Sequence, residues 1–308
     1  MKKVSILPLL LIAYGVSAQT VDEAENLIYH ARYDNAVQTL QNVIEKDPAN
    51  AEAYYWQTTA YLQQDKADAV KQNLLAAPEG VKGTPLYQVA YGHLLLEQGR
   101  KDSAAQYFNN ALKATREKDA FVLSAVAKAH IEAKEGDAAY AIELLDKAIK
   151  REKKDPALYT LKGDAYLKLQ NGSEAFKAYQ EALDKDSKYA AALYKLGNIF
   201  ASQKNEELYL KYYNDVLQAD PNYAPAYYAL YYHHYFKDVS KAMDYFKQYM
   251  ERTDKTLETE YAYTDLLYLN KQYNEAIQNA SAIINKAGVD AEPRLYKLIA
   301  YSYRDQQD

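Results

Sequence analysis

A pattern of about 34 residues recurs along this chain of 308 residues, and it limits the possible folds more than any other feature. The stretch YTLKGDAYLKLQNGSEAFKAYQEALDKDS begins at Tyr159, and LYKLGNIFASQKNEELYLKYYNDVLQADP begins 34 residues later at Leu193. Gly163 and Gly197 align in the two stretches. A repeat of this length is one supersecondary unit that cannot bury its apolar face alone, so neighbouring units must stack.

One position of the repeat can be followed from end to end. It recurs at intervals of 33 to 37 residues and is a small residue in all repeats but one: Ala36, Ala69, Ala104, Ala141, Ala175, Tyr209, Ala242 and Ala276. A small residue there lets two helices approach closely, and a glycine in the middle of the first helix serves the same purpose despite its low helix propensity.

The pattern resembles the tetratricopeptide repeat, a pair of antiparallel helices. The residues that carry the resemblance in the first stretch are Tyr159, Gly163, Tyr166, Ala175, Tyr179 and Ala182. In the second stretch they are Leu193, Leu196, Gly197, Phe200, Tyr213, Val216 and Pro221. Asp-Pro pairs at residues 47–48, 155–156 and 220–221 fit the end of one helix and the start of the next.

The resemblance implies an all-α, right-handed superhelical solenoid of antiparallel helix pairs. We expect about eight pairs within residues 19–308, and one more first helix over Pro293–Tyr303. Two interpretations of this end stay open: the last helix is a solvating cap, or the chain is the front part of a longer protein. In the family, the first helix of each pair lines a concave surface that binds extended peptides or partner proteins.

Residues 1–18 have the pattern of a secretory signal peptide. Lys2 and Lys3 precede an apolar run over Val4–Val16, and Ser17-Ala18 forms a small-residue cleavage site. No cysteine follows this site, so a lipoprotein is not expected. We therefore predict export to the periplasm of a Gram-negative bacterium.

The composition excludes several classes of functional site. The chain has no cysteine, which excludes disulfides, thiolate nucleophiles and thiolate zinc sites. The formal net charge of −5 argues against a nucleic-acid partner, and no later segment is long and apolar enough to be expected to span a membrane. The oligomeric state is left open.

The resemblance also implies which side chains face the groove. The ninth position of the first helix is inward-facing in the family, and here it is always polar or amphipathic: Glu25, Thr59, His93, His130, Asp164, Asn198, Tyr232, Asp265 and Tyr301. The same frame places aromatic residues inward at Tyr194, Tyr228, Tyr232, Tyr235, Phe236, Tyr261, Tyr268 and Tyr301. Tyrosine combines a rigid ring with a polar tip and suits recognition. The competing interpretation is that many of the 33 tyrosines are core residues.

Catalysis and metal binding find little support. His93 and His130 occupy equivalent positions, but nothing in their spacing brings them to one ion. His233 and His234 are adjacent on a helix and point about 100° apart. No zinc-protease, phosphate-loop or nucleophile-elbow motif is present. We therefore predict no enzyme activity, no metal and no cofactor.

The sequence thus predicts an exported, non-enzymatic scaffold that binds a protein or extended peptide in its concave groove, with a possible place in envelope or secretion-complex assembly. Asn198 matches one position of the family's carboxylate clamp, but Thr160 and Asp164 do not match its partners, so no clamp is predicted. Two alternatives stay open. One is a glycan-binding module that uses Tyr228, Tyr232 and Tyr235, and the other is a regulatory repeat region of a larger protein.

Overall fold

The computed structural model describes residues 20–288 and 292–307, and in this part of the chain it has eighteen α-helices and no strand. The predicted signal peptide, residues 1–18, lies outside the described residues. No helix in the described part is long and apolar enough to cross a bilayer.

The helices alternate between two roles. The first helices of the pairs are α1 (Val21–Tyr29), α3 (Ala51–Leu62), α6 (Pro85–Glu97), α8 (Ala120–Glu132), α10 (Pro156–Lys168), α12 (Ala190–Ser202), α14 (Ala224–His234) and α16 (Leu257–Leu269). The second helices are α2 (Tyr33–Lys46), α4 (Ala67–Ala76), α7 (Lys101–Ala114), α9 (Ala138–Arg151), α11 (Gly172–Lys185), α13 (Glu206–Ala219), α15 (Val239–Arg252) and α17 (Tyr273–Ala287). The short α5 (Glu79–Lys82) follows α4, and α18 (Pro293–Asp305) packs on α17.

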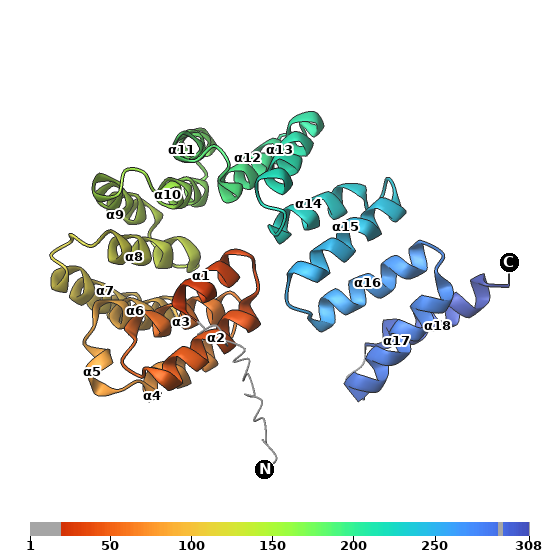
Figure 1. The fold of residues 1–308 in the computed structure, drawn as a ribbon, viewed down its shortest axis with the longest axis horizontal. Coiled ribbons are helices and arrows are strands. Elements are labelled where there is room, and N and C mark those ends of the chain that lie inside the picture. Colours follow the sequence, from red (N-terminus) through yellow and green to blue (C-terminus); the bar gives the residue numbers. More distant parts are fainter. Residues whose placement is uncertain (1–19, 289–291, 308) are drawn as a thin grey trace, which may run out of the picture.

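Each first helix packs on its own second helix. Up to α10 it also contacts the next first helix, whereas α14 and α16 are contacted by the second helix before them, α13 and α15. The pairs follow one another in a curved row, from α3 over α10 and α13 to α18 (Figure 1). The prediction of an all-α, right-handed superhelical solenoid of antiparallel helix pairs is confirmed.

An aromatic ring lies against a glycine in three of the pairs. A Cβ atom added to Gly92 would come within 2.6 Å of the Phe108 ring, and one added to Gly197 would come within 2.7 Å of the Tyr213 ring. Gly163 has the same relation to Tyr179. Real Cβ atoms do not approach a ring so closely, so only glycine permits this helix spacing.

Two of these tyrosines are also held by their hydroxyl groups. Tyr179 donates to Asp164 Oδ1 at 2.6 Å, and Tyr213 donates to Asn198 Oδ1 at 2.8 Å. Each acceptor is the residue directly after the repeat glycine. Each tyrosine of the second helix thus contacts the glycine with its ring and the next residue with its hydroxyl group. The two contacts together fix the position of the second helix on the first.

The turns between helices repeat as well. The turn from first to second helix has a residue with positive φ in most repeats: Ala31, Asp65, Gly99, Gln170, Lys204 and Lys271. Side chains at the start of four second helices then accept a backbone N–H three residues ahead: Asp137, Asn171, Asn205 and Asp238. Such caps satisfy N–H groups that have no partner within the helix.

The buried core is divided along the solenoid. One large cluster runs from Ala24 to Ala165, and a second runs from Tyr231 to Leu298. Between them, smaller clusters join the pairs around α11, α12 and α13. The two large clusters belong to the two ends of the curved row. Their relative position therefore depends on contacts outside these clusters.

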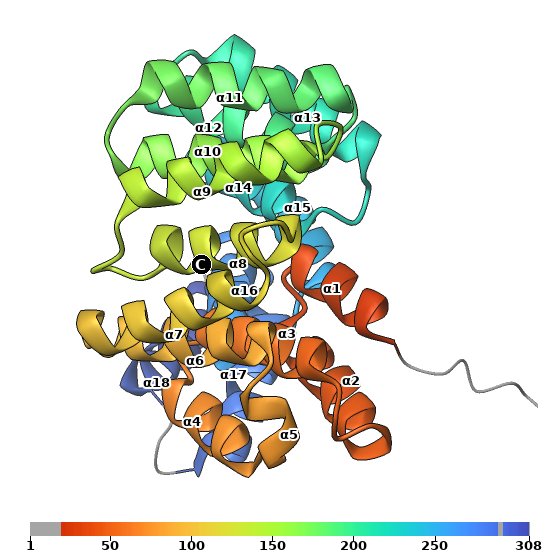
Figure 2. The ribbon, with the colours of Figure 1, turned by 90° about the vertical axis from the view of Figure 1, so that its left-hand side faces the viewer.

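The first pair supplies such contacts, because it lies against pairs that are far away in the sequence (Figures 1 and 2). The Tyr29 ring centre is 6.1 Å from that of Tyr189 and 5.4 Å from that of Tyr223. Its hydroxyl oxygen accepts the backbone N–H of Ala191 at 3.2 Å.

Two polar contacts continue this interface. His30 Nε2 lies 2.8 Å from Asp220 Oδ2, and the backbone N–H of Asp34 donates to Asp254 Oδ2 at 2.7 Å. The three hydrogen-bonded pairs of residues are 162, 190 and 220 positions apart in the chain. We call them the closure contacts, since through them the solenoid returns on itself.

We expect Gly163→Ala to destabilise the protein although alanine favours helices. Its methyl group must displace the Tyr179 ring, and overpacking of this kind costs about 1–3 kcal/mol in the free energy of unfolding. Gly172→Ala is the matched control, since no atom lies within 4 Å of its added Cβ. Urea unfolding followed by circular dichroism measures both. A neutral Gly163→Ala would contradict the close approach.

Candidate partner-binding clefts

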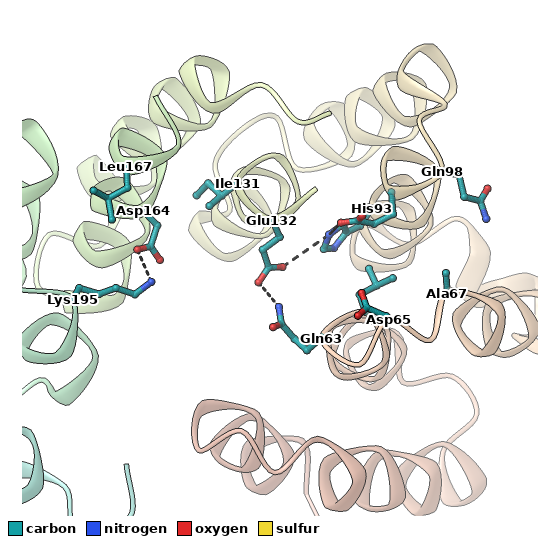
Figure 3. A pocket seen from close by; sticks show the side chains of 12 residues that line it. Gln63, Asp65, Ala67, His93, Gln98, Ile131, Glu132, Asp164, Leu167 and Lys195 are labelled. Atoms are coloured by element: carbon teal, nitrogen blue, oxygen red, sulfur yellow. Dashed lines mark hydrogen bonds and ion pairs between the residues drawn. The ribbon is translucent and has the colours of Figure 1, made fainter. Parts of the chain in front are cut away.

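Two clefts open on the inner side of the solenoid. The first, the polar cleft, has a volume of about 700 Å³ and is formed mainly by first helices. It is lined by Leu62, Gln63, Asp65, Ala67, His93, Glu97, Gln98, Ile131, Glu132, Asp164, Leu167 and Lys195. Most of them lie on or next to α3, α6, α8, α10 and α12. Figure 3 shows Glu132 pointing toward His93 and Gln63, and Asp164 pointing toward Lys195.

His93 and Glu132 form a long ion pair at this cleft and leave polar atoms without a hydrogen-bond partner (Figure 3). The His93 ring is 3% exposed, and its Nε2 has no hydrogen-bond partner. It lies 3.6 Å from Glu97 Oε1 and 3.9 Å from Glu132 Oε2, which are both too long for a hydrogen bond. Glu132 Oε2 also has no hydrogen-bond partner, whereas Oε1 is paired with the Lys128 ammonium group. Buried polar atoms are normally satisfied, so these two atoms would gain from a hydrogen bond to a group that enters the cleft once a small rotation of either side chain exposes them.

Two pairs of polar side chains in the cleft interact with each other. Gln63 Nε2 donates to Glu132 Oε1 at 2.7 Å, which joins the end of α3 to the end of α8 (Figure 3). Asp164 forms an ion pair with Lys195 at 2.8 Å while it accepts the Tyr179 hydroxyl. The cleft therefore presents both signs of charge in fixed positions.

The second cleft, the closure cleft, has a volume of about 520 Å³ and lies where the first two pairs meet the last ones. Its lining is Ala31, Tyr33, Asp34, Gln63, Gln64, Asp65, Lys66, Tyr228, Tyr231, Phe246, Tyr249, Thr253, Asp254, Thr256, Glu258, Thr259 and Ala262. Aromatic rings come from α2, α14 and α15, and carboxylates come from both sides. Gln63 and Asp65 line both clefts.

The predicted groove residues do not form one continuous surface. His93 and Asp164 line the polar cleft, and Tyr228, which is 46% exposed, lines the closure cleft. His130 lines neither cleft: its ring lies between Phe108 and Tyr140, and its Nδ1 accepts the backbone N–H of Asp137.

Asn198 and Tyr194 are engaged in the packing of the helices. Asn198 accepts the Tyr213 hydroxyl, as described above. Tyr194 is half-buried, with its ring centre 5.8 Å from that of Tyr213 and 5.6 Å from that of Tyr223. Neither residue lines a cleft.

Three further predicted residues are covered by α18. Tyr261 is buried, and the Arg294 guanidinium lies 4.9 Å from its ring centre. The same guanidinium lies 3.6 Å from Asp265 Oδ2. Tyr268 donates its hydroxyl to Asp305 Oδ2 at 2.7 Å. The last helix thus already occupies this part of the surface.

The remaining predicted residues are on the surface outside both clefts. Tyr232 is 67% exposed and Phe236 is 86% exposed, whereas Tyr235 between them is half-buried against Tyr231. Tyr301 on α18 is partly exposed beneath Arg304. The proposed patch of Tyr228, Tyr232 and Tyr235 is therefore divided between the closure cleft and the open surface.

Sequence reasoning missed several residues of the two clefts. Glu97 is four positions after His93, a spacing that places both on one helix face, and this signal was available. Outside the clefts, Asp220 makes a closure contact with His30 but was interpreted only as part of a helix stop. Nothing local marks Asp254 and Tyr249 as neighbours of Tyr33, because that contact depends on the curvature of the whole solenoid.

No group of three or more His, Cys, Asp or Glu is arranged to hold a metal ion within residues 20–288 and 292–307.

Comparison with known proteins agrees with this architecture. The sequence family described as tetratricopeptide repeat matches residues 21–80, 89–156, 126–190 and 160–224. DnaJ homolog subfamily C member 3 from Gallus gallus is 32% identical over 102 residues, which are 32% of this chain and 20% of that protein.

Two solved structures share the fold at low sequence identity. The human IFIT1 dimer with PPP-AAAA has a TM-score of 0.57 and 15% identity, over 94% of this chain and 72% of that one. The APC/C hetero-tetramer Cut9-Hcn1 has a TM-score of 0.53 and 15% identity, over 91% of this chain and 54% of that one. The chain spans about half the length of this last structure and a fifth of the chicken protein.

His130 should make stability depend on pH. Burial lowers its pKa to about 4, from 6.5, with Asp137 opposing the shift and Lys168 and His93 adding to it. The unfolded chain then binds the proton more readily, so stability is full above pH 6.5 and falls as the pH decreases towards 4. We expect the melting temperature of His130→Gln to fall less between these pH values than that of the wild type. An equal fall in both proteins would contradict this assignment.

Proposed function

Since the chain belongs to the tetratricopeptide repeat family, we propose that it is a non-enzymatic scaffold that binds a protein partner, as an extended segment, on the inner side of its solenoid. Membership of the family supports the general role in protein–protein interaction. The finer statement rests on the polar cleft, where first helices of five pairs present polar side chains to one space.

One observation carries the proposal: the unpartnered Nε2 of His93 and Oε2 of Glu132 at the wall of the polar cleft. An extended segment has free backbone N–H and C=O groups. After a small rotation of the two side chains, it can supply a donor to the carboxylate and either a donor or an acceptor to the imidazole. Lys195 and Asp164 are close by for charged groups of the same segment.

A second candidate is a glycan-binding module. It is favoured by Tyr232 and Phe236, whose rings are exposed on the surface next to the closure cleft. Exposed aromatic faces suit the apolar faces of sugar rings. Nucleic acid is a third class to be tested, because IFIT1, which shares the fold, was solved with PPP-AAAA.

The compartment is part of the proposal. Residues 1–18 have the sequence pattern of a cleaved signal peptide, which supports export to the periplasm. There the scaffold would assist the assembly of an envelope or secretion complex. A role as the repeat region of a larger protein remains compatible with the same clefts.

The partner class can be tested by photocrosslinking within the polar cleft. A benzoylphenylalanine at position 167 replaces a leucine that lines the cleft, and the same group at Leu75 is the control on a second helix. In the native envelope fraction we expect an adduct at position 167 that mass spectrometry identifies as a crosslink to a peptide of a second protein and that ribonuclease and glycosidase leave intact.

Glu132→Gln should then reduce this adduct by about five- to ten-fold, because it removes the charge that accepts the donor of the partner. Equal capture at positions 167 and 75 would contradict binding in the polar cleft. An adduct in which mass spectrometry finds no peptide of a second protein, and which glycosidase removes, would favour the glycan-binding module instead.

Export predicts a defined mature protein. Mass spectrometry of the protein from its native host should find an N-terminal peptide that begins at Gln19 and none from residues 1–18. Recovery of the intact N-terminus in the cytoplasmic fraction would contradict the periplasmic location.

A further inference from the structure

We propose that the closure cleft binds a basic side chain, an arginine above all, of the partner segment. This inference rests on the proposed function for the nature of the partner, and it adds the chemistry that the partner must carry. It concerns a surface built from both ends of the solenoid, which no single repeat contains.

The aromatic side of the cleft can contact a flat cation. Tyr228 is 46% exposed, and its ring centre lies 5.1 Å from that of Tyr249 and 5.4 Å from that of Tyr231. Burial raises the pKa of Tyr231 and of Tyr33 to about 12, so both rings are neutral phenols at physiological pH. A guanidinium group stacks favourably on such rings.

The charge of the lining favours the same ligand. Asp34, Asp65, Asp254 and Glu258 contribute four carboxylates, and Lys66 contributes the one ammonium group. Lys66 Nζ is already engaged with Asp34 Oδ1 at 3.2 Å. The cleft therefore presents an excess of negative charge to whatever enters it.

Asp254 shows that this charge is incompletely compensated. Burial raises its pKa, as does the nearby charge of Asp34, whereas the backbone N–H groups of Asp34 and Asn35 and the charge of Arg32 lower it. A cation entering the cleft would lower the pKa again and stabilise the carboxylate. Arg32 does not line the closure cleft, so its guanidinium group does not fill the cleft.

The chain places an arginine on a tyrosine ring at other positions as well. The Arg294 guanidinium lies on the Tyr261 ring and against the Asp265 carboxylate, as described above. Arg252 likewise lies 4.5 Å from the Tyr227 ring centre. At both places a tyrosine face on a first helix receives an arginine from a neighbouring element. Tyr228 and the nearby carboxylates offer this arrangement with no arginine in it.

The closure contacts hold the two sides of the cleft together. Tyr33 and Asp34 belong to the first pair, whereas Tyr228, Tyr249 and Glu258 belong to the last ones. His30 with Asp220, and the Asp34 N–H with Asp254, join these sides. Binding of the basic side chain should therefore be strongest in the closed solenoid, and loss of a closure contact should weaken it.

A pair of labelled peptides on the full chain provides the test. Two fluorescein-labelled heptapeptides of Gly and Ser differ only at the central position, which is arginine or its neutral isostere citrulline. Fluorescence anisotropy gives the two dissociation constants. We expect the arginine peptide to bind about five- to ten-fold more tightly than the citrulline peptide.

Variants with matched controls locate the binding. Tyr228→Ala and Glu258→Gln should each bring the affinity ratio close to one. Tyr232→Ala, on the same helix, and Glu251→Gln, on α15, change exposed residues outside the cleft and should leave the ratio unchanged. His30→Ala does not alter the lining but removes a closure contact, and it should lower the ratio. Circular dichroism melts confirm that each variant is folded.

Equal affinity of the wild type for the two peptides would overturn the inference. The same holds if Tyr232→Ala lowers the ratio as much as Tyr228→Ala does, since the binding would then be non-specific. The adduct at position 167 is measured separately. If it is a protein while the peptides bind equally, only the closure cleft is misassigned; if it is not a protein, the proposed function fails as well.

Discussion

The contact between a glycine of the first helix and an aromatic ring of the second sets the geometry on which the rest of the structure depends. Gly163 with Tyr179 and Gly197 with Tyr213 let the two helices of a pair approach more closely than any side chain would allow. The adjacent Asp164 and Asn198 then hold the hydroxyl groups of the same tyrosines. Because central pairs of the solenoid are fixed in this way, small rotations between pairs accumulate along it in one direction.

That accumulated curvature produces the closure contacts. The first pair meets the start of α12 and the turns before α14 and α16 only because the intervening pairs keep a nearly constant geometry. The residues involved are short or aromatic: Tyr29 inserts between Tyr189 and Tyr223, and His30 reaches Asp220. The closure cleft follows from these contacts, whereas the polar cleft is a property of consecutive first helices.

The sequence was sufficient for the repeat, the helix pairs and the role of the repeat glycines, since all three are local and recur every 34 residues or so. It was less informative about single side chains. Asp164 and Asn198 were predicted to face the groove, and the structure shows that each is bonded to a tyrosine of the second helix. Tyr261 and Asp265 are covered by Arg294, which no repeat frame could indicate because α18 lies beyond the last complete pair. The proximity of Tyr33 and Tyr249 could not be predicted, because it depends on the curvature of the whole solenoid.

The two clefts are connected through the turn between α3 and α4. Gln63 and Asp65 line both of them, and Asp65 has a positive φ that holds the turn in a conformation rare for a residue with a side chain. Gln63 is also hydrogen-bonded to Glu132, whose other carboxylate oxygen is unpartnered in the polar cleft. A partner segment that crosses this turn would meet a mixed-charge surface at one end and an acidic, aromatic one at the other. Such an asymmetry fixes the direction in which a chain can lie, because a basic residue is favoured at one end only.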